Sequence, residues 1–451
     1  METTKPQNSI TEGVIWKQIL LFFLPVAFGT FFQQMYNTAD TLIVGRCLDM
    51  DALAAVGGIT AHIITLIVNF IVALTSGVAV VISQYYGAKN GDSVSHSVHT
   101  GIALSVLIGA VFTLLGIYLV PHTLRFLNQP EALIPDSVRY IQIYFIGMFP
   151  TVFYNMGASV IRAIGDSRRP MIYLIVCCIT NIVLDYYFIA VLHMGVDGAA
   201  WATVVAQFIS AVLVYIRLRT VRDCYKLSPF RIRFHKAELR QMLIIGLPAG
   251  FQSLMYSVTN TFIQARINLY GKEAVAAWTV LGKVDGITWL ILSALGVAVT
   301  TFVSQNYGAG KIKRVYRSIH VSLLMGAVIV AGCSILMWVF GADLFRLFKA
   351  EGEVLDYGLK MLYLIAPFYV LFVPIEIFSG GMRGVGDVTI PTIITGIGIC
   401  AFRVSMISVM YHFSHDLKWI VLSYGFSWII SSLAFFLYYK FGHWLKLPKD
   451  N

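Results

Sequence analysis

Charged residues are scarce in this sequence. Asp, Glu, Lys and Arg make up 12% of its 451 residues, whereas a soluble globular domain carries about 25%. Hydrophobic residues make up 58% of the chain, and many of them lie in long apolar runs. This composition excludes a soluble enzyme or binding domain. It predicts an all-α polytopic membrane protein.

Several other signatures are missing. The six cysteines show no spacing typical of a metal or redox site. No Walker A motif is present, so we expect no direct use of ATP and no cofactor. The first apolar run lacks a basic leader and a small-residue cleavage site, so we interpret it as a retained helix. The net charge of +10 arises in the loops, and we therefore expect no nucleic-acid partner.

Apolar runs long enough to cross a bilayer recur along the whole chain. A membrane-spanning helix needs about 20 such residues. We count twelve candidate helices, centred near Gly29, Ile67, Leu107, Met148, Cys178, Gln207, Ser253, Trp289, Val328, Val370, Ile399 and Trp428.

Lys and Arg gather in loops on one side of these spans. The basic loops are those around Arg162–Arg169, Arg217–Arg240 and Lys311–Arg317. Because basic loops stay in the cytoplasm, we expect a multi-pass protein of the cytoplasmic membrane with both termini inside the cell. Contact with anionic lipids accounts for the same loops.

The chain also contains an internal repeat. RAIGDSRRP at Arg162 matches RGVGDVTIP at Arg383, and Gln84 matches Gln305, both at a separation of 221 positions. Six spans per repeat give the two halves the same orientation, so their pseudo-two-fold axis runs along the membrane normal. We predict an N-terminal six-helix lobe at 1–220, a basic cytoplasmic linker at 221–239 and a C-terminal six-helix lobe at 240–451.

The first span carries polar residues within its apolar run. Gln33, Tyr36, Asn37 and Asp40 follow the spacing i, i+3, i+4, i+7, which places them along one helical stripe. A carboxylate at mid-membrane costs about 3 kcal/mol or more, so Asp40 is expected to face a cavity, another helix or a bound cation. Pro25 lies near the start of this span, and Pro248 lies near the start of the seventh. Each is a candidate bend as well as a tolerated early-helix proline.

A second acid lies in the fifth span. Asn181 and Asp185 share one helical face, and Thr203 and Gln207 do so in the sixth span. At the repeat offsets, Ile263 and Met406 occupy the positions that correspond to Asp40 and Asp185. The first lobe therefore holds a pair of acids that the second lacks. Two desolvated carboxylates suit proton transfer, and with neighbouring oxygens they also suit Na⁺. Interhelical hydrogen bonding without transport is the alternative.

The second half has charges of its own. Lys283, Asp285 and Arg403 suggest a charge network between helices, with Arg403 paired to Glu376 or Asp285. Polar, aromatic and Met side chains are candidates for lining a central substrate cavity. These candidates are Gln33, Tyr36, Asn37, Asn155, Met255, Tyr256, Asn260 and Glu376.

Several motifs in their order resemble the multidrug and toxic compound extrusion (MATE) family. They are LPV at Pro25, TADTLIVG at Asp40, RAIGDSRRP at Arg162, NIVLD at Asp185, GAAWAT at Trp201 and VSQNYGAGK at Gln305. The chain is most similar to the prokaryotic DinF-like branch. The resemblance implies a V-shaped fold of two bundles and antiport of drugs against H⁺ or Na⁺.

The resemblance also implies particular site residues. The cation site of that branch matches Asp40, Asn181, Asp185 and Thr203, with Tyr36 and Asn155 as further polar residues of the cavity. The other large branch relies on acids of the second lobe. Here Ile263 and Gln264 occupy the region where its seventh-helix acid would lie, although Glu376 is present.

The sequence is compatible with three functions. The first is a monomeric secondary antiporter that exports organic, cationic, drug-like compounds against H⁺ or Na⁺ entry and catalyses no reaction. The second is a lipid-linked precursor flippase of the same superfamily, for which Arg403 is the only indication and against which the acidic first lobe counts. The third is a membrane enzyme that acts on lipids, with Asp185 and Asp197 as metal ligands.

Overall fold

The computed structural model describes residues 10–48, 50–127 and 129–445. Within these residues all regular elements are helices, and none is a strand. The chain divides into two compact units. We call Leu24–Gly250 the N-terminal unit, and Phe251–Asn451 together with the chain up to Phe23 the C-terminal unit.

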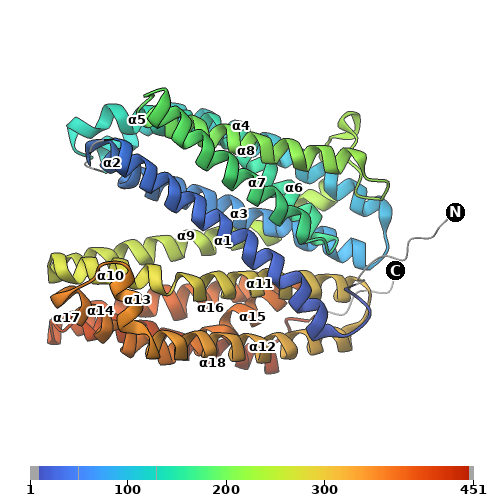
Figure 1. Ribbon diagram of the computed structural model, residues 1–451. Helices are drawn as coiled ribbons and strands as arrows, with labels where there is room; N and C mark the ends of the chain where they lie inside the picture. The colour runs from blue at the N-terminus through green and yellow to red at the C-terminus, as the bar shows by residue number, and fades with distance from the viewer. Residues whose placement is uncertain (1–9, 49, 128, 446–451) are drawn as a thin grey trace. The chain divides into compact units, whose positions relative to one another are not determined.

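Seven α-helices and three short helical turns lie wholly inside the N-terminal unit (Figure 1). In chain order they are α2 (Met50–Gly57), α3 (Ile59–Gly87), α4 (Gly91–Phe126), η1 (Glu131–Leu133), α5 (Ile134–Ile146), α6 (Met148–Ala163), α7 (Arg168–Asp185), η2 (Tyr186–Val191), α8 (Val196–Thr220) and η3 (Pro229–Arg231).

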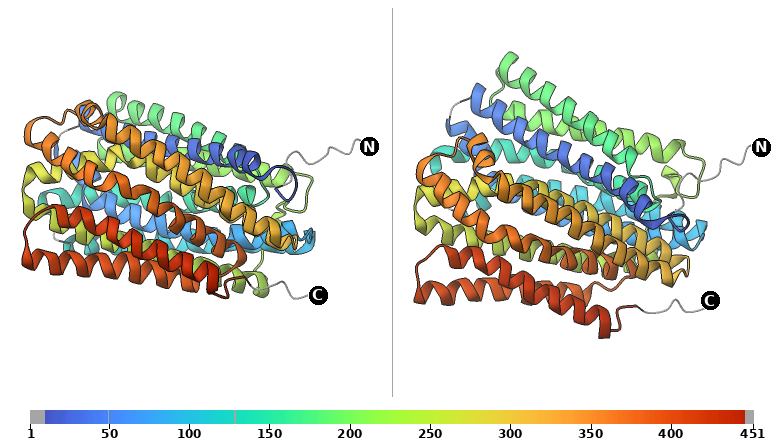
Figure 2. Two further views of the ribbon diagram at one scale, coloured as in Figure 1. Left: turned by 90° about the horizontal axis from the view of Figure 1, so that it is seen from below. Right: turned by 60° about the horizontal axis from the view of Figure 1, so that its bottom comes forward.

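The C-terminal unit holds the elements that follow (Figure 2). They are η4 (Asn268–Tyr270), α10 (Lys272–Val284), α11 (Gly286–Gly308), α12 (Ile312–Val339), α13 (Gly341–Leu347), α14 (Gly352–Ile365), η5 (Ala366–Phe368), α15 (Tyr369–Val385), α16 (Thr389–Thr395), η6 (Gly396–Ala401), α17 (Phe402–Phe413) and α18 (Lys418–Phe441).

Two helices are divided between the units. They are α1 (Ile15–Cys47) and α9 (Lys236–Ile267), with boundaries after Phe23 and after Gly250. This differs from the predicted division at the linker. Each boundary falls within two residues of a proline, Pro25 or Pro248, that lies inside its helix. A proline inside a helix removes one backbone hydrogen bond, which weakens the continuity of the helix there.

Among the residues that the structure describes, eleven helices are long and apolar enough to cross a membrane. The twelfth predicted span, centred near Met148, consists of α5 and α6, which meet at Gly147. Neither piece alone reaches the length of a span, since α5 has 13 residues and α6 has 16. The prediction of an all-α protein with twelve spans is thus confirmed, with one span broken in the middle.

The internal repeat is visible in the backbone. Gly165 and Gly386, in the two repeated GD motifs, both adopt left-handed φ values, +101° and +93°. An L-residue with a side chain rarely adopts this conformation, so glycine permits the tight connection between successive helices. Both motifs are helix connections, as predicted.

Close packing within each unit depends on small residues. In the N-terminal unit α7 runs beside α8, as Figure 1 shows, and α4 packs on α6. A Cβ added at Gly116 of α4 would lie 2.0 Å from the ring of Phe145, so only glycine fits there. In the C-terminal unit α15 packs against α11, α12 and α18 (Figure 1). The interior of each unit is therefore set by helix-to-helix contact.

Candidate functional site

The four residues of the predicted cation site all lie in the N-terminal unit. Asp40 comes from α1, Asn181 and Asp185 from α7, and Thr203 from α8. Asp185 is 0% exposed, Asn181 1% and Thr203 5%. The Nδ2 of Asn181 donates a hydrogen bond to the Oγ1 of Thr203 at 3.4 Å. Asp40 lies close enough to Asp185 for their charges to interact. Three helices thus bring two acids and two neutral oxygens together.

The backbone around Asp185 is irregular. The α-helix α7 ends at Asp185, and the chain continues as the π-helix η2. A π turn changes the direction in which neighbouring side chains point, and such turns are often found at functional sites. Asn181 and Asp185 are one turn apart on α7, so both face the same side, towards α8.

Several buried oxygens of this cluster have no hydrogen-bond partner within the described part of the chain. They are Oδ1 of Asp40, Oδ1 of Asn181, both carboxylate oxygens of Asp185 and Oε1 of Gln207. All five atoms are acceptors if the carboxylates are ionised. Among the described residues, no Lys, Arg or His forms an ion pair with either acid. Unpaired buried acceptors are costly. A proton or a hard cation such as Na⁺ would satisfy them.

Three further residues border the cluster. Gln207 lies one turn after Thr203 on α8 and is 5% exposed. Tyr140 and Tyr144, on the half-span α5, are buried and feel the charge of Asp40. Neither tyrosine was among the predicted site residues, because α5 is only half of a broken span. Their spacing of four residues was the available signal.

The residues of the polar stripe on α1 differ in how deeply they are buried. Tyr36 is 8% exposed and lies within hydrogen-bonding reach of Gln207. Asn37 is exposed and Gln33 is half-buried. Neighbouring residues on a helix are about 100° apart, so Tyr36 and Asn37 mark opposite edges of the stripe. Only the edge with Tyr36 and Asp40 faces the interior of the N-terminal unit.

Two other candidates for lining the cavity lie on helices that do not contribute to the cluster. Asn155 is half-buried on α6, and its amide donates to the carbonyl of Thr151 one turn earlier. Asn260, the repeat partner of Asn37, is exposed on α9. Both halves of the repeat therefore expose the same asparagine.

The C-terminal unit has a separate polar site. The carboxylate of Glu376 on α15 lies over Gly296 of α11, where an added Cβ would come within 1.9 Å of its Oε1. Tyr256 of α9 is close enough to feel the charges of Glu376 and Arg403. The glycine thus makes room for a half-buried acid between two packed helices.

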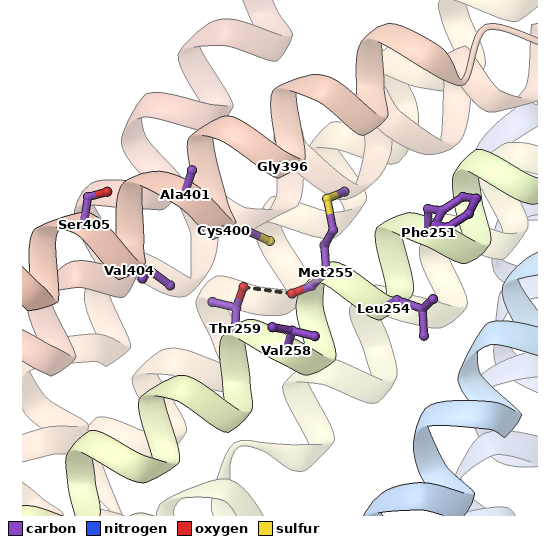
Figure 3. A pocket seen from close by; sticks show the side chains of 10 residues that line it. All are labelled: Phe251, Leu254, Met255, Val258, Thr259, Gly396, Cys400, Ala401, Val404 and Ser405. Carbon is purple, nitrogen blue, oxygen red and sulfur yellow. Dashed lines mark hydrogen bonds between the residues drawn. The ribbon is translucent and has the colours of Figure 1, made fainter. Parts of the chain in front are cut away.

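A groove of about 490 Å³ lies beside this region (Figure 3). Met255 and Thr259 of α9 face Cys400 of η6 across it, and Thr259 donates a hydrogen bond to the carbonyl of Met255 at 2.8 Å. The remaining lining is mainly apolar, from Phe251, Leu254, Val258, Gly396, Ala401, Val404 and Ser405. Of the cavity candidates, Met255 lines this groove.

The predicted charge network in the C-terminal unit does not form. Arg403 donates to the hydroxyl of Ser427 from Nε and Nη2, at 3.2 and 2.8 Å, and its guanidinium lies 3.8 Å from the ring centre of Tyr424. The expected pairing of Arg403 with Glu376 or Asp285 is therefore wrong. The face of an aromatic ring attracts a cation and replaces the missing acid.

Asp285 and Lys283 are also separate from Arg403. Asp285 accepts hydrogen bonds from Trp289 at 3.0 Å and from Tyr369 at 2.8 Å. Lys283 is exposed and makes no ion pair with any residue that the structure describes. Aromatic N–H and O–H groups, rather than a base, satisfy the buried acid.

The metal-enzyme interpretation required Asp185 and Asp197 together. Asp197 forms an ion pair with Arg139. In the described part of the chain, no group of three or more His, Cys, Asp or Glu is placed to hold a metal. In the described residues, Asp185 and Asp197 therefore belong to no such group.

Comparison with known proteins identifies the family. The MatE family model matches residues 25–187 and 248–408, one segment in each half of the repeat. The probable multidrug resistance protein YpnP of Bacillus subtilis is 30% identical over 436 residues, 96% of this chain and 97% of that protein. The probable multidrug resistance protein NorM of Thermotoga maritima is 24% identical and covers 90% of this chain and 87% of its own length.

A solved structure has the same fold. A transporter of the MOP superfamily from Pyrococcus furiosus superposes with a TM-score of 0.90 at 21% sequence identity. The match covers 97% of this chain and 98% of that one. At this identity the likeness establishes the fold alone.

Proposed function

The chain belongs to the MatE family of multi-pass membrane transporters, and on this premise we propose that it is a secondary antiporter. It exports organic, cationic, drug-like compounds by alternating access while H⁺ or Na⁺ enters. It needs no cofactor, catalyses no reaction and works as a monomer in the cytoplasmic membrane with both termini inside the cell. The names of the multidrug resistance relatives support the substrate class.

One observation carries the proposal: the five unpartnered acceptor oxygens around Asp40, Asn181, Asp185 and Gln207. Two carboxylates in a desolvated site repel each other strongly unless a cation joins them. Loading and release of that cation therefore change the energy of the site by several kcal/mol. A conformational change that opens the site to the other side of the membrane is coupled to this energy.

Thr203 and Tyr36 have supporting roles in this mechanism. Thr203 accepts the hydrogen bond of Asn181, which occupies the donor side of the amide and leaves its buried Oδ1 unpartnered. The hydroxyl of Tyr36, held near Gln207, places a neutral polar group beside them. Neither residue carries charge, so both tune the affinity for the cation without replacing it.

The test is efflux from proteoliposomes under imposed gradients. Purified protein is reconstituted, and export of a cationic dye is followed with a Na⁺ gradient, a pH gradient or neither. Asp40→Asn and Asp185→Asn are expected to lower coupled export at least about tenfold, since each removes a charge that the cation requires. Asp51→Asn is the matched control, because Asp51 is an exposed acid in the first turn of α2, within the same unit.

Two results would contradict the proposal. One is coupled export that persists in both site variants while folding is intact. The other is translocation of a lipid-linked precursor headgroup, with no dye export under either gradient, which would favour the flippase. The internal partners of Arg403, Ser427 and Tyr424, already argue against that alternative.

A further inference from the structure

The segment between α8 and α9 is held at both ends by two adjacent residues of α4. The backbone N–H of Ser228 donates to Nε2 of His99 at 3.1 Å. Thr100 donates from Oγ1 to the carbonyl of Arg233 at 3.5 Å and accepts from the backbone N–H of His235 at 3.1 Å. Residues 228–235 therefore form a short loop fastened to the bundle at its base. We call this segment the tethered loop.

The anchors of the tethered loop are buried and specific. His99 is 3% exposed and Thr100 is 0% exposed. His99 donates from Nδ1 to the carbonyl of Ser95 at 2.7 Å, which leaves Nε2 free to accept from Ser228. Just before the loop, Tyr225 and Leu227 are buried against the bundle. This part of the chain is therefore packed on the N-terminal unit and hydrogen-bonded to it.

The tip of the loop is exposed and alternates apolar and basic residues. Phe230 lies in the single turn η3 and is 103% exposed. Arg231 and Arg233 are exposed on either side of the half-buried Ile232, and Phe234 is 45% exposed. A fully exposed phenylalanine on a fastened loop is unfavourable in water. It therefore indicates a partner with an apolar component.

The positive charge of the loop indicates that this partner is anionic. Between the two spans, residues 221–235 carry four bases (Arg222, Lys226, Arg231 and Arg233) and one acid, Asp223. The structure describes no ion pair for Arg222, Lys226 or Arg231. The spans end at Thr220 and resume at Lys236, so the loop is close to the headgroup layer. Phosphate headgroups complement free bases there, and an aromatic ring suits the boundary between headgroups and acyl chains.

We propose that the tethered loop is a binding site for anionic phospholipid. Phe230 inserts into the interface of the adjacent leaflet, and Arg231, with Arg222 and Lys226, binds headgroup phosphates. Since α4 holds the base of the loop, binding fixes the start of α9 relative to the bilayer. The site is separate from the cation cluster and does not depend on the transport mechanism.

Photo-crosslinking tests the proposal on the full chain. Phe230 is replaced by p-benzoylphenylalanine, and the protein is reconstituted in phosphatidylcholine vesicles containing a minor share of phosphatidylglycerol. After irradiation, intact-protein mass spectrometry identifies the adducts. Phosphatidylglycerol adducts are expected to exceed the share of that lipid by roughly threefold. In the Lys226→Gln/Arg231→Gln variant, the excess is expected to disappear while lipid adducts persist.

Phe413 provides the matched control position. It is 78% exposed in the last turn of α17 and has no Lys or Arg beside it in the sequence. At this position, the share of phosphatidylglycerol among the lipid adducts is expected to equal its share in the vesicles. The proposal is overturned if adducts at position 230 also follow the mixture, if no lipid adduct forms, or if irradiation yields a cross-linked dimer. The last outcome would make the loop a contact between copies of the chain.

Discussion

The side-chain amide of Asn181 donates a hydrogen bond to the hydroxyl of Thr203 at 3.4 Å, from α7 to α8. The contact leaves Oδ1 of Asn181 without a hydrogen-bond partner among the described residues. Both carboxylate oxygens of Asp185 also lack one. The neutral pair thus uses the donor side of the amide and leaves an acceptor oxygen unpaired on the same helical face as Asp185. This arrangement explains why a threonine and an asparagine belong to a site whose charge comes from elsewhere.

The first prediction removes the Thr203 hydroxyl. Thr203→Val keeps the shape of the side chain but leaves Asn181 free to turn. Removing the acceptor leaves the buried amide donor of Asn181 unpaired, which costs about 1–3 kcal/mol. The apparent affinity for the coupling ion is therefore expected to fall by about tenfold or more. Ion-dependent efflux measures the change, and Thr123→Val, an exposed threonine of α4, should leave the affinity unaltered. Equal affinity in both variants would exclude Thr203 from the site.

The second prediction concerns two helices that nearly touch. A Cβ added at Gly77 of α3 would lie 2.4 Å from the carbonyl oxygen of Met242 on α9. Because the obstacle is backbone, Gly77→Ala is expected to cost about 3 kcal/mol and lower the melting temperature in detergent. Gly332→Ala is the control, since nothing lies within 4 Å of an added Cβ there. That variant should be neutral or slightly stabilising. Equal melting temperatures would show that the two helices separate easily.

The third prediction addresses the buried guanidinium of Arg403. Ser427 accepts hydrogen bonds from both Nε and Nη2 of Arg403, so Ser427→Ala leaves this buried cation over the Tyr424 ring without them. The free energy of unfolding is expected to fall by about 1.5–3 kcal/mol. Ser408→Ala, which removes an exposed hydroxyl of α17, serves as the control. Thermal unfolding followed by intrinsic tryptophan fluorescence would measure both changes. A loss no larger than that of the control would mean that the cation is solvated.

The fourth prediction is a pH dependence of the tethered loop. Burial, the ring of His96 stacked at 4.1 Å, and Arg233 all lower the pKa of His235. His235 is neutral in the folded chain because its Nε2 accepts from Arg233. The folded state binds fewer protons than the unfolded state in this range. Docking is therefore strongest above the ordinary pKa of about 6.5 and weakens as the pH falls below it.

Hydrogen exchange of residues 228–235, normalised to a free peptide of the same sequence, measures this effect. Exchange is expected to rise as the pH is lowered from about 7.5 to about 5.5. His235→Gln should show little change over the same range. Glu238 and His99 also lie near His235, so each is to be substituted separately. A pH response that survives in His235→Gln would assign the effect to another group.

Much of the fold followed from sequence pattern. Apolar runs of sufficient length predicted twelve spans because a bilayer forces backbone groups to bond within each segment. The matching GD motifs predicted two similar halves, and Gly165 and Gly386 share a left-handed turn. The intramembrane acids singled out Asp40 and Asp185 because an unpaired charge there is costly.

Other features could not be read from the pattern. The spacing of residues on one helix does not show which neighbouring helix supplies a partner. For this reason Tyr140 and Tyr144 were not predicted as site residues, and the predicted partners of Arg403 were wrong. The division of α1 and α9 between two units depends on which helices they pack against on each side of Pro25 and Pro248. Likewise, only the fold shows that His99 and Thr100 hold a loop more than a hundred residues away.

The sequence by itself determined that this chain crosses a membrane repeatedly, that it is duplicated and that Asp40 and Asp185 have no acidic counterparts in the second half. Local composition decides these points, since the bilayer acts on each segment independently. Only the tertiary structure decided which oxygens remain unpaired, because that depends on contacts between helices that are distant along the chain. The cation cluster and the tethered loop both arise from such contacts.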